Sequence, residues 1–469
     1  MLRSGLVLAG GMATGALLRF ARNVLLARLI SVADYGIAST FIISGALVEL
    51  VGDLALDRML VQDRDGDDPR MMATLHTLMV ARGLIFGLLF YVCAGPIALL
   101  FNQPELTWAY EVFALVPVVR GFIHLDTMRA QRRMSFGPMI KAELVSSGGS
   151  LLLLWPVALW LGDFRVMLVL LIAQQVLRVL TTHVLARVPY RVGFDIPIAM
   201  RAFHFGWPLL LAGILVFFAM QGERVIVANQ FSAVELGLFS AALTLAITPA
   251  LLLANVAQRF LLPLLAAAQD DADRFEAEAR RALELMLCAG AGLALGCALI
   301  GPELFRIAFG APMAEGAVYM IPVALSAGFR VAQAGPVTVI LARGRTINHL
   351  TANLAALVAL PIAFWAVLYG GGLEVLILIG AAGLMGANAM AIGLMVWRDG
   401  LRAPGRMRWV YALGLVFAAV IAADALGLLP RDIAMGLAGL LFIALVAGCV
   451  SIRRQARQIL SRITRRVGA

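Results

Sequence analysis

The chain has 469 residues, of which 62% are hydrophobic and only 14% carry a charge. Soluble domains average about 25% charged residues, so this composition excludes an ordinary soluble protein. Apolar runs of about 20 residues recur along the chain, and a run of that length crosses a bilayer as a helix. We therefore predict an all-α integral membrane protein.

Fourteen apolar segments follow one another and predict about fourteen transmembrane helices. They cover residues 4–30, 35–56, 72–101, 106–125, 139–161, 166–186, 204–229, 236–265, 282–309, 316–341, 349–369, 373–397, 409–427 and 432–451. We assign the first six helices to an N-lobe (1–190) and the next six to a C-lobe (191–400). The last two helices and a basic cytoplasmic tail form residues 401–469.

The charged residues between these segments predict the orientation. The net charge is +10, but its distribution argues against nucleic acid as a partner. One set of alternate connections, together with both termini, carries 26 arginine and lysine residues, whereas the opposite set carries three. Positive residues concentrate in cytoplasmic loops. Since the number of helices is even, both termini are predicted to be cytoplasmic.

The first apolar segment contains two arginines at membrane depth. Arg19 and Arg22 are three residues apart and share one helical face, with Gly11 and Gly15 on roughly the same face one and two turns earlier. A charge at this depth costs several kcal/mol unless it faces protein or water. The segment therefore predicts a helix that lines a wet, positively charged interior. The two glycines predict close contact with another helix.

The opening stretch Gly5–Gly36 has a counterpart 201 residues later, at Gly206–Gly237. Both predict a long helix, a short outer turn and a second helix. The two predicted lobes then form a repeat, and transporters built from repeats place the substrate path between them. Paired positions under this offset are Ser31 with Ser232, Asp34 with Glu235 and Ser39 with Ser240.

Two polar stretches between the apolar segments have a specific interpretation. Residues 266–281 combine helical composition with alternating charge, which predicts an interfacial helix. Residues 63–68 are rich in aspartate but lack the glycine position and final glutamate of a calcium loop, so we predict a solvated turn. We interpret His124 and Asp126 as surface polar groups and not as a catalytic pair.

The sequence predicts no cofactor, no metal and no catalytic residue. A phosphate-binding loop is excluded because the single lysine, Lys141, follows an isoleucine. The five histidines lack the H-E-x-x-H spacing, and the four cysteines form no C-x-x-C pair.

Two stretches carry a resemblance to a known family. ARLISVADYG, which ends at Gly36, is similar to the A-R-L-L-S-P-x-D-Y-G turn of polysaccharide flippases in the multidrug/oligosaccharidyl-lipid/polysaccharide exporter superfamily, with Val32 in place of proline. Residues 223–266 resemble the seventh and eighth helices of that family. There Glu223 stands where aspartate is frequent, residues 236–239 fill the L-G-x-[YF] motif, and Pro263 closes the helix.

This resemblance implies a flippase that moves a polyprenyl-diphosphate-linked oligosaccharide across the bacterial cytoplasmic (inner) membrane, for lipopolysaccharide or exopolysaccharide synthesis. Its partners would be this lipid-linked substrate, membrane lipids and polysaccharide polymerase or export machinery. Two alternatives stay open. A drug or organic-cation exporter of the same superfamily would require an acidic cavity. A membrane-embedded polysaccharide polymerase would require a larger extramembrane region than this chain provides.

Arginines inside the apolar segments are the candidate substrate ligands, because a guanidinium stays charged and its fork matches phosphate. In the resembled family the first, second, seventh and eighth helices line the cavity. This implies Arg19, Arg22, Arg224 and Arg259 as ligands, and Arg82, Arg178 and Arg330 are further candidates.

The alternative interpretation is that these arginines form buried ion pairs that fix helix packing. Candidate partners are Glu49, Asp53 and Glu143. Glu223, Glu49 and Asp53 are also our candidates for coupling or gating, because acidic residues at membrane depth are costly and frequently functional.

Overall fold

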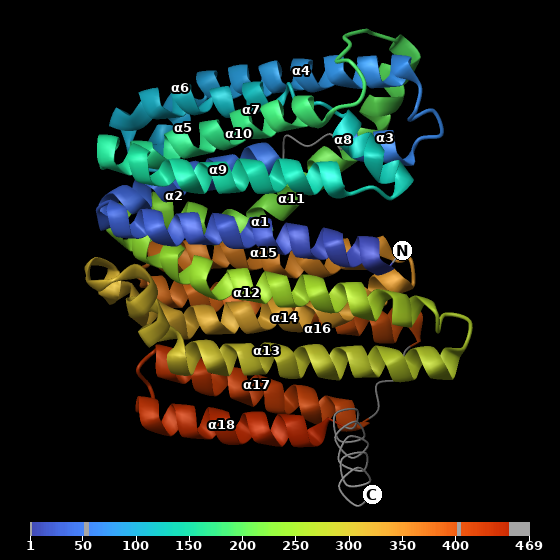
Figure 1. Ribbon diagram of the computed structural model, residues 1–469. Coiled ribbons are helices and arrows are strands. Elements are labelled where there is room, and N and C mark those ends of the chain that lie inside the picture. Colours follow the sequence, from blue (N-terminus) through green and yellow to red (C-terminus); the bar gives the residue numbers. More distant parts are fainter. Residues whose placement is uncertain (1, 51–55, 401–404, 450–469) are drawn as a thin grey trace, which may run out of the picture. The chain divides into compact units, whose positions relative to one another are not determined.

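The computed structural model describes residues 2–50, 56–400 and 405–449. Within these ranges every regular element is a helix, which confirms the predicted fold class (Figure 1). The chain divides into two compact units, Met1–Ala241 and Ala242–Ala469, and the boundary falls inside α12 (Ala233–Ala266). The division into an N-lobe, a C-lobe and a C-terminal pair stays a prediction.

The first unit contains eleven α-helices and the start of α12. Their bounds are α1 Leu2–Leu29, α2 Val32–Leu50, α3 Leu56–Gln62, α4 Pro69–Val92, α5 Ala94–Leu100, α6 Thr107–Phe113, α7 Leu115–Arg120, α8 Asp126–Arg129, α9 Gly137–Leu161, α10 Arg165–Leu185 and α11 Ile196–Gln230. Short 3-10 helices occupy Pro104–Leu106 and Ala130–Arg133.

The second unit is organised around α14, almost all of whose residues are buried. This helix packs against α13, α16 and α17. The bounds are α13 Ala272–Phe309, α14 Met320–Ala342, α15 Thr346–Leu368, α16 Leu373–Asp399, α17 Gly405–Ala425 and α18 Arg431–Gly448, with a 3-10 helix at Ala311–Tyr319.

Twelve helices in the described ranges are long and apolar enough to cross a membrane, so the predicted count of fourteen is approximate. Two predicted segments break where a proline removes a backbone donor. Pro96 cannot donate to the carbonyl of Val92, the last residue of α4, and Pro117 cannot donate to that of Phe113, the last residue of α6. The predicted segment 106–125 is therefore two short helices, α6 and α7, followed by a turn.

The stretch at 266–281 differs from its prediction as a separate interfacial helix. Asp271 accepts a hydrogen bond from the Arg274 amide and caps α13, which then continues without a break for 38 residues to Phe309. The charged residues are the first turns of a membrane-crossing helix. At 1.5 Å per residue this helix is longer than a bilayer is thick.

Helices α1 and α9 pack closely through the two glycines of α1, as predicted (Figure 1). A Cβ on Gly11 would overlap the side chain of Ile140, and a Cβ on Gly15 would lie 2.8 Å from Cγ of Glu143. Each glycine therefore leaves room for a larger α9 side chain, which brings Glu143 against α1.

The repeat predicted at an offset of 201 residues appears as two equivalent helix starts. The Ser31 hydroxyl accepts from the Asp34 amide at 3.0 Å and lies 2.5 Å from Oδ2 of that aspartate. At the start of α12 the Ser232 hydroxyl accepts from the Glu235 amide at 3.2 Å and lies 2.7 Å from its Oε2. A serine followed three residues later by an acidic residue is a helix-start signal, and both copies use it.

The two helix starts also meet each other at glycines that the repeat makes equivalent. A Cβ on Gly36 would overlap the backbone carbonyl of Ala233, and a Cβ on Gly237 would lie 2.6 Å from the Val32 carbonyl oxygen. Val32 and Ala233 are themselves 201 residues apart. Gly36 therefore faces Ala233 just as Gly237, its equivalent in the repeat, faces Val32. A two-fold relation between the two helix starts produces such a reciprocal contact.

Candidate functional site

A carboxylate bridges two arginines from two other helices in the first unit. Oε1 of Glu143 in α9 pairs with Arg19 of α1, and its Oε2 pairs with Arg178 of α10. The Ser147 hydroxyl donates to the same Oε1 at 3.2 Å. Three of the predicted residues thus meet in one place. Their helices bring together side chains that are up to 159 positions apart in the sequence (19 to 178).

Arg22 lies one turn beyond Arg19 and has a different environment. Arg22 is only 4% exposed, and its guanidinium donates to Gln174 Oε1 at 2.6 Å and to the Ser150 hydroxyl at 3.1 Å. A buried charge requires such polar partners. Both are neutral, so the positive charge of Arg22 is solvated and not neutralised.

Glu49 and Arg120 extend the charged region. Their carboxylate and guanidinium are 4.0 Å apart, and Glu49 lies close enough to Arg19 and Arg178 to act on both electrostatically. We name the set Arg19, Arg22, Glu49, Arg120, Glu143 and Arg178 the arginine cluster. It holds four cations and two carboxylates, a formal excess of two positive charges. The Arg19 side chain is 40% exposed, so the cluster is accessible from the surface.

The other predicted ligands lie elsewhere in the two units. Arg82 is buried on α4. Arg224 on α11 donates to Gln221 Oε1 at 3.3 Å and to the Ser240 carbonyl at 3.4 Å, and Glu223 is its neighbour in the chain. Arg259 on α12 and Arg330 on α14 belong to the second unit. Asp53 lies outside the described residues.

Sequence reasoning named Glu143 as a possible partner but missed Gln174 and the two serines. Their signal was the presence of polar residues inside apolar segments, at Ser146–Ser150 and Gln174–Gln175. Such residues are expected to face protein and not lipid. The pattern does not say which helix they face, because the partner lies on another segment of the chain.

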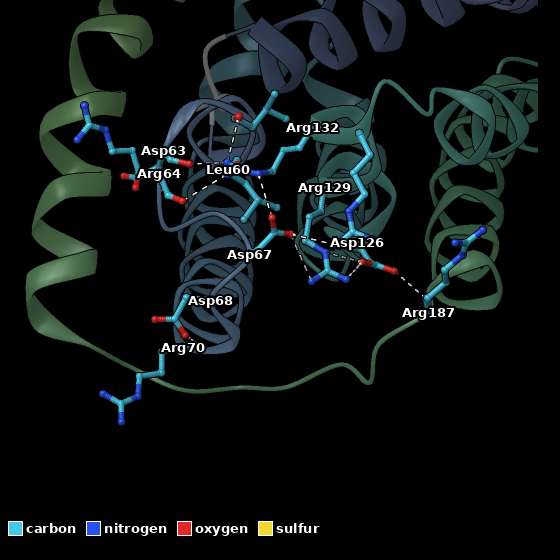
Figure 2. A network of polar contacts seen from close by, with 12 residues as sticks. Leu60, Asp63, Arg64, Asp67, Asp68, Arg70, Asp126, Arg129, Arg132 and Arg187 are labelled. Carbon is cyan, nitrogen blue, oxygen red and sulfur yellow. Dashed lines mark hydrogen bonds and ion pairs between the residues drawn. The ribbon is translucent and has the colours of Figure 1, made fainter. Parts of the chain in front are cut away.

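A second polar network gathers at the end of the unit where α3, α4 and α8 meet (Figure 2). The Arg132 guanidinium donates to the Leu60 carbonyl at 3.0 Å and the Val61 carbonyl at 3.1 Å, and so caps the C-terminal end of α3. Asp67 lies 3.9 Å from Arg129 and 3.6 Å from Arg132. The predicted solvated turn at 63–68 is thus tied down by ion pairs.

His124 and Asp126 contradict the prediction that they are surface groups, since they are 1% and 7% exposed. Asp126 pairs with Arg129 at 2.7 Å and accepts from the backbone amide of Arg187 at 2.7 Å. The chain beyond α10 folds back over both residues, which no local pattern shows. Among the described residues, no group of three or more histidine, cysteine, aspartate or glutamate side chains is arranged to hold a metal ion.

Solved structures share this fold over nearly the whole chain. The lipid II flippase MurJ in an inward-closed conformation aligns with a TM-score of 0.70 at 12% identity, covering 94% of this chain and 98% of that one. An inward-facing multidrug-resistance MATE transporter of the MOP superfamily gives 0.59 at 14%, covering 82% and 94%. A eukaryotic MATE transporter gives 0.59 at 17%, covering 84% and 96%. At these identities the likeness establishes the fold.

No curated protein sequence matches the chain significantly. The family described as polysaccharide biosynthesis protein matches residues 25–315, which is more than half of the chain. This match agrees with the resemblance inferred from ARLISVADYG and from residues 223–266. The chain is a multi-pass membrane protein that belongs to the polysaccharide biosynthesis protein family and has the fold of the MOP-superfamily transporters.

Proposed function

We propose that the protein is a flippase for polyprenyl-diphosphate-linked oligosaccharide in a bacterial cytoplasmic membrane, where it serves surface polysaccharide synthesis. Both termini would be cytoplasmic, as the distribution of arginines predicts. The observation that carries this proposal is the arginine cluster, with its excess of positive charge and its accessible Arg19. The family of polysaccharide biosynthesis proteins and a fold shared with a lipid II flippase support it.

Diphosphate is the chemical group that suits this cluster. A guanidinium keeps its charge at any physiological pH and binds phosphate oxygens through two parallel hydrogen bonds. We assign the contact with the diphosphate to Arg19, since its side chain is exposed and pairs with a single carboxylate. Arg22 adds positive charge behind it while its own donors are occupied by Gln174 and Ser150.

Glu143 is the counter-ion of two arginines in the cluster. Its two oxygens neutralise Arg19 and Arg178. A diphosphate carries more negative charge than a carboxylate and would draw Arg19 away, while Arg178 and Ser147 retain Glu143. No buried carboxylate is left unpaired by this exchange, which matters because an unpaired buried charge is strongly unfavourable.

The remaining predicted residues complete the proposal. Alternating access between the two lobes would expose the site first to the cytoplasm and then to the outer leaflet. Arg82, Arg224, Arg259 and Arg330 are the further ligands that we propose along this path. Glu223, Glu49 and Asp53 are the proposed coupling or gating residues, and an ion gradient, the membrane potential or consumption of the product would supply the energy.

A leaflet-translocation assay tests the proposal. The protein is reconstituted into vesicles with a fluorescent polyprenyl-diphosphate-linked sugar, and a quencher added outside reports the lipid that reaches the outer leaflet. Arg19→Gln should lower the rate about tenfold or more, since it removes a charge-assisted bidentate contact. Arg28→Gln is the matched control, because Arg28 is an exposed arginine in the last turn of the same helix.

The outcomes separate the candidate functions. Translocation by the wild type and by Arg28→Gln, with loss in Arg19→Gln, supports the proposal. Wild-type rates in Arg19→Gln would contradict the role of the arginine cluster. Absence of sugar-lipid movement together with uptake of an organic cation would instead support the exporter alternative, and polymer formation from the same substrate would support a polymerase.

A further inference from the structure

The connection between α10 and α11 is fastened along its whole length to the first unit. We name residues 186–195 the strap. The Arg187 amide donates to Asp126 Oδ2 at 2.7 Å (Figure 2), and the Asp195 amide donates to the Thr74 hydroxyl at 3.2 Å. Between them, Thr77 donates its hydroxyl to the Gly193 carbonyl at 2.6 Å. Both ends of the strap are therefore attached to the first unit.

Two buried histidines make the other attachments, and each uses both ring nitrogens. Nε2 of His76 accepts from the Leu125 amide at 3.1 Å, and its Nδ1 lies 3.2 Å from the Arg191 carbonyl. Because an amide can only donate and a carbonyl can only accept, His76 must carry its single proton on Nδ1. The side chain links α4, the turn before α8 and the strap.

His124 repeats this arrangement with the opposite tautomer. Its Nδ1 accepts from the Asp126 amide at 3.1 Å, and its Nε2 lies 3.0 Å from the Val188 carbonyl. The proton therefore sits on Nε2. His76 and His124 are 0% and 1% exposed, so water does not replace a partner that either ring loses.

The rings also pack against one another and against the strap. Tyr190 of the strap stacks on His76 with ring centroids 4.2 Å apart, and His76 meets His124 edge-on at 4.9 Å. His183 of α10 lies 5.2 Å from His124, and its Nε2 is 2.9 Å from the Phe122 carbonyl. Burial raises the pKa of Tyr190, so its ring remains neutral at physiological pH.

Only neutral imidazoles fit these contacts. A second proton on His76 or His124 would point a ring N–H at the backbone N–H that now donates to that ring, and this backbone N–H has no other acceptor there. If both rings were protonated, two imidazolium cations would lie about 5 Å apart in a site closed to water. The other charges facing the pair are Asp126, which favours protonation, and Arg129, which opposes it. Asp126 is already engaged by Arg129 and the strap amide.

We propose that His76 and His124 form a proton-operated latch that holds the strap at neutral pH and releases it when the adjacent compartment acidifies. The latched state binds fewer protons than the released state, so falling pH favours release. This inference stands apart from the transported substrate, since it rests on contacts outside the arginine cluster.

Release would loosen the entry into α11. The first turns of this helix pack Ile198 and Ala202 against α3 and α4, and Arg201 lies 3.2 Å from Asp65. The strap is the chain segment that joins the first six predicted membrane helices to α11. A change in its attachment therefore acts on the connection through which one predicted lobe is linked to the next.

Hydrogen–deuterium exchange of the full-length protein in lipid nanodiscs tests the latch. Peptides that cover residues 186–195 are compared at about pH 7.5 and about pH 5, a range over which an accessible histidine changes charge. Exchange times are rescaled because the intrinsic rate of amide hydrogen exchange itself depends on pH. Peptides from the buried helix α14 serve as the internal reference. We expect protection of the strap to fall about tenfold or more on acidification.

Two substitutions connect this change to the histidines. The double variant His76→Gln with His124→Gln keeps a donor and an acceptor on each side chain but cannot be protonated, so its strap protection should become independent of pH. His183→Gln is the matched control. His183 accepts no amide in this geometry, so its replacement should leave the pH response in place.

The proposal is overturned if strap protection in the wild type is the same at both pH values, or if the double variant responds to pH as the wild type does. Should the double variant not fold, each single variant is measured alone. A smaller response in both singles supports the latch, and an unchanged response in both rejects it.

Discussion

A methyl group added at Gly36 is expected to damage the protein, whereas the same methyl at Gly45 in the same helix should not. The Gly36 Cβ would overlap the backbone of Ala233, whose Cα is only 3.2 Å away. Backbone cannot rotate aside as a side chain can. At Gly45 the nearest atom is Cζ of Phe113 at 4.0 Å, so an added Cβ makes an ordinary contact.

The two substitutions should therefore differ in sign. Overpacking costs about 1–3 kcal/mol, while replacing a helical glycine by alanine gains about 0.5–1 kcal/mol. Gly36→Ala should lose about 1–2 kcal/mol net and Gly45→Ala should gain slightly. The assay is the apparent melting temperature of purified protein in detergent, where the first variant should melt several degrees lower and the second at or above the wild type.

The reciprocal contact gives a further check on the same reasoning. Gly237→Ala places its Cβ 2.6 Å from the Val32 carbonyl oxygen, so it should destabilise the protein as Gly36→Ala does. Since both changes push the same two helix starts apart, the double variant should lose less than the sum of the singles. Equal stability of Gly36→Ala and Gly45→Ala, or strict additivity of the glycine pair, would refute the close contact.

Two further substitutions test the arginine cluster. Glu143→Gln should tighten the binding of inorganic pyrophosphate several-fold in titration calorimetry, because the carboxylate of Glu143 no longer competes for Arg19. Weaker binding in this variant would show that Glu143 only positions the arginines. Arg22→Met should lower the free energy of unfolding by about 1–3 kcal/mol because it leaves Gln174 Oε1 without its donor. A melting temperature equal to that of the wild type would argue against this buried role for Arg22.

Much of the fold was predictable because hydrophobic length and local signals determine it. Apolar runs marked the membrane helices, and the offset of 201 residues paired Ser31 with Ser232 and Asp34 with Glu235, which the structure places at equivalent helix starts. The breaks after α4 and α6 were not predictable from proline alone. Pro96 and Pro117 stand four residues after the ends of these helices, but α9, α11, α12 and α13 continue through prolines of their own.

The site was predictable only in part, because its contacts join distant residues. Arg19 and Glu143 are 124 positions apart, and Arg22 and Gln174 are 152 apart. The cost of a membrane charge indicates that a partner exists, but the choice among partners depends on which helices become neighbours. The same limit explains the error at His124, which is buried only because Val188, 64 positions later, passes over it.

The repeat bears on which predicted lobe would bind the diphosphate in the proposed function. The two copies of the repeat keep the same residues at their helix starts, namely the capping serines and the glycines where the two starts contact each other. They differ where charge would meet substrate, since Arg19 corresponds to Met220 and Arg22 to Glu223 under the same offset. Two repeats with identical side chains would offer two equal anion sites, and a diphosphate would bind neither repeat in preference to the other. In the proposed function, Arg19 and Arg22 of α1 would therefore supply the main positive charge for the diphosphate, and Arg224, Arg259 and Arg330 of the second predicted lobe would add contacts along the path between the repeats.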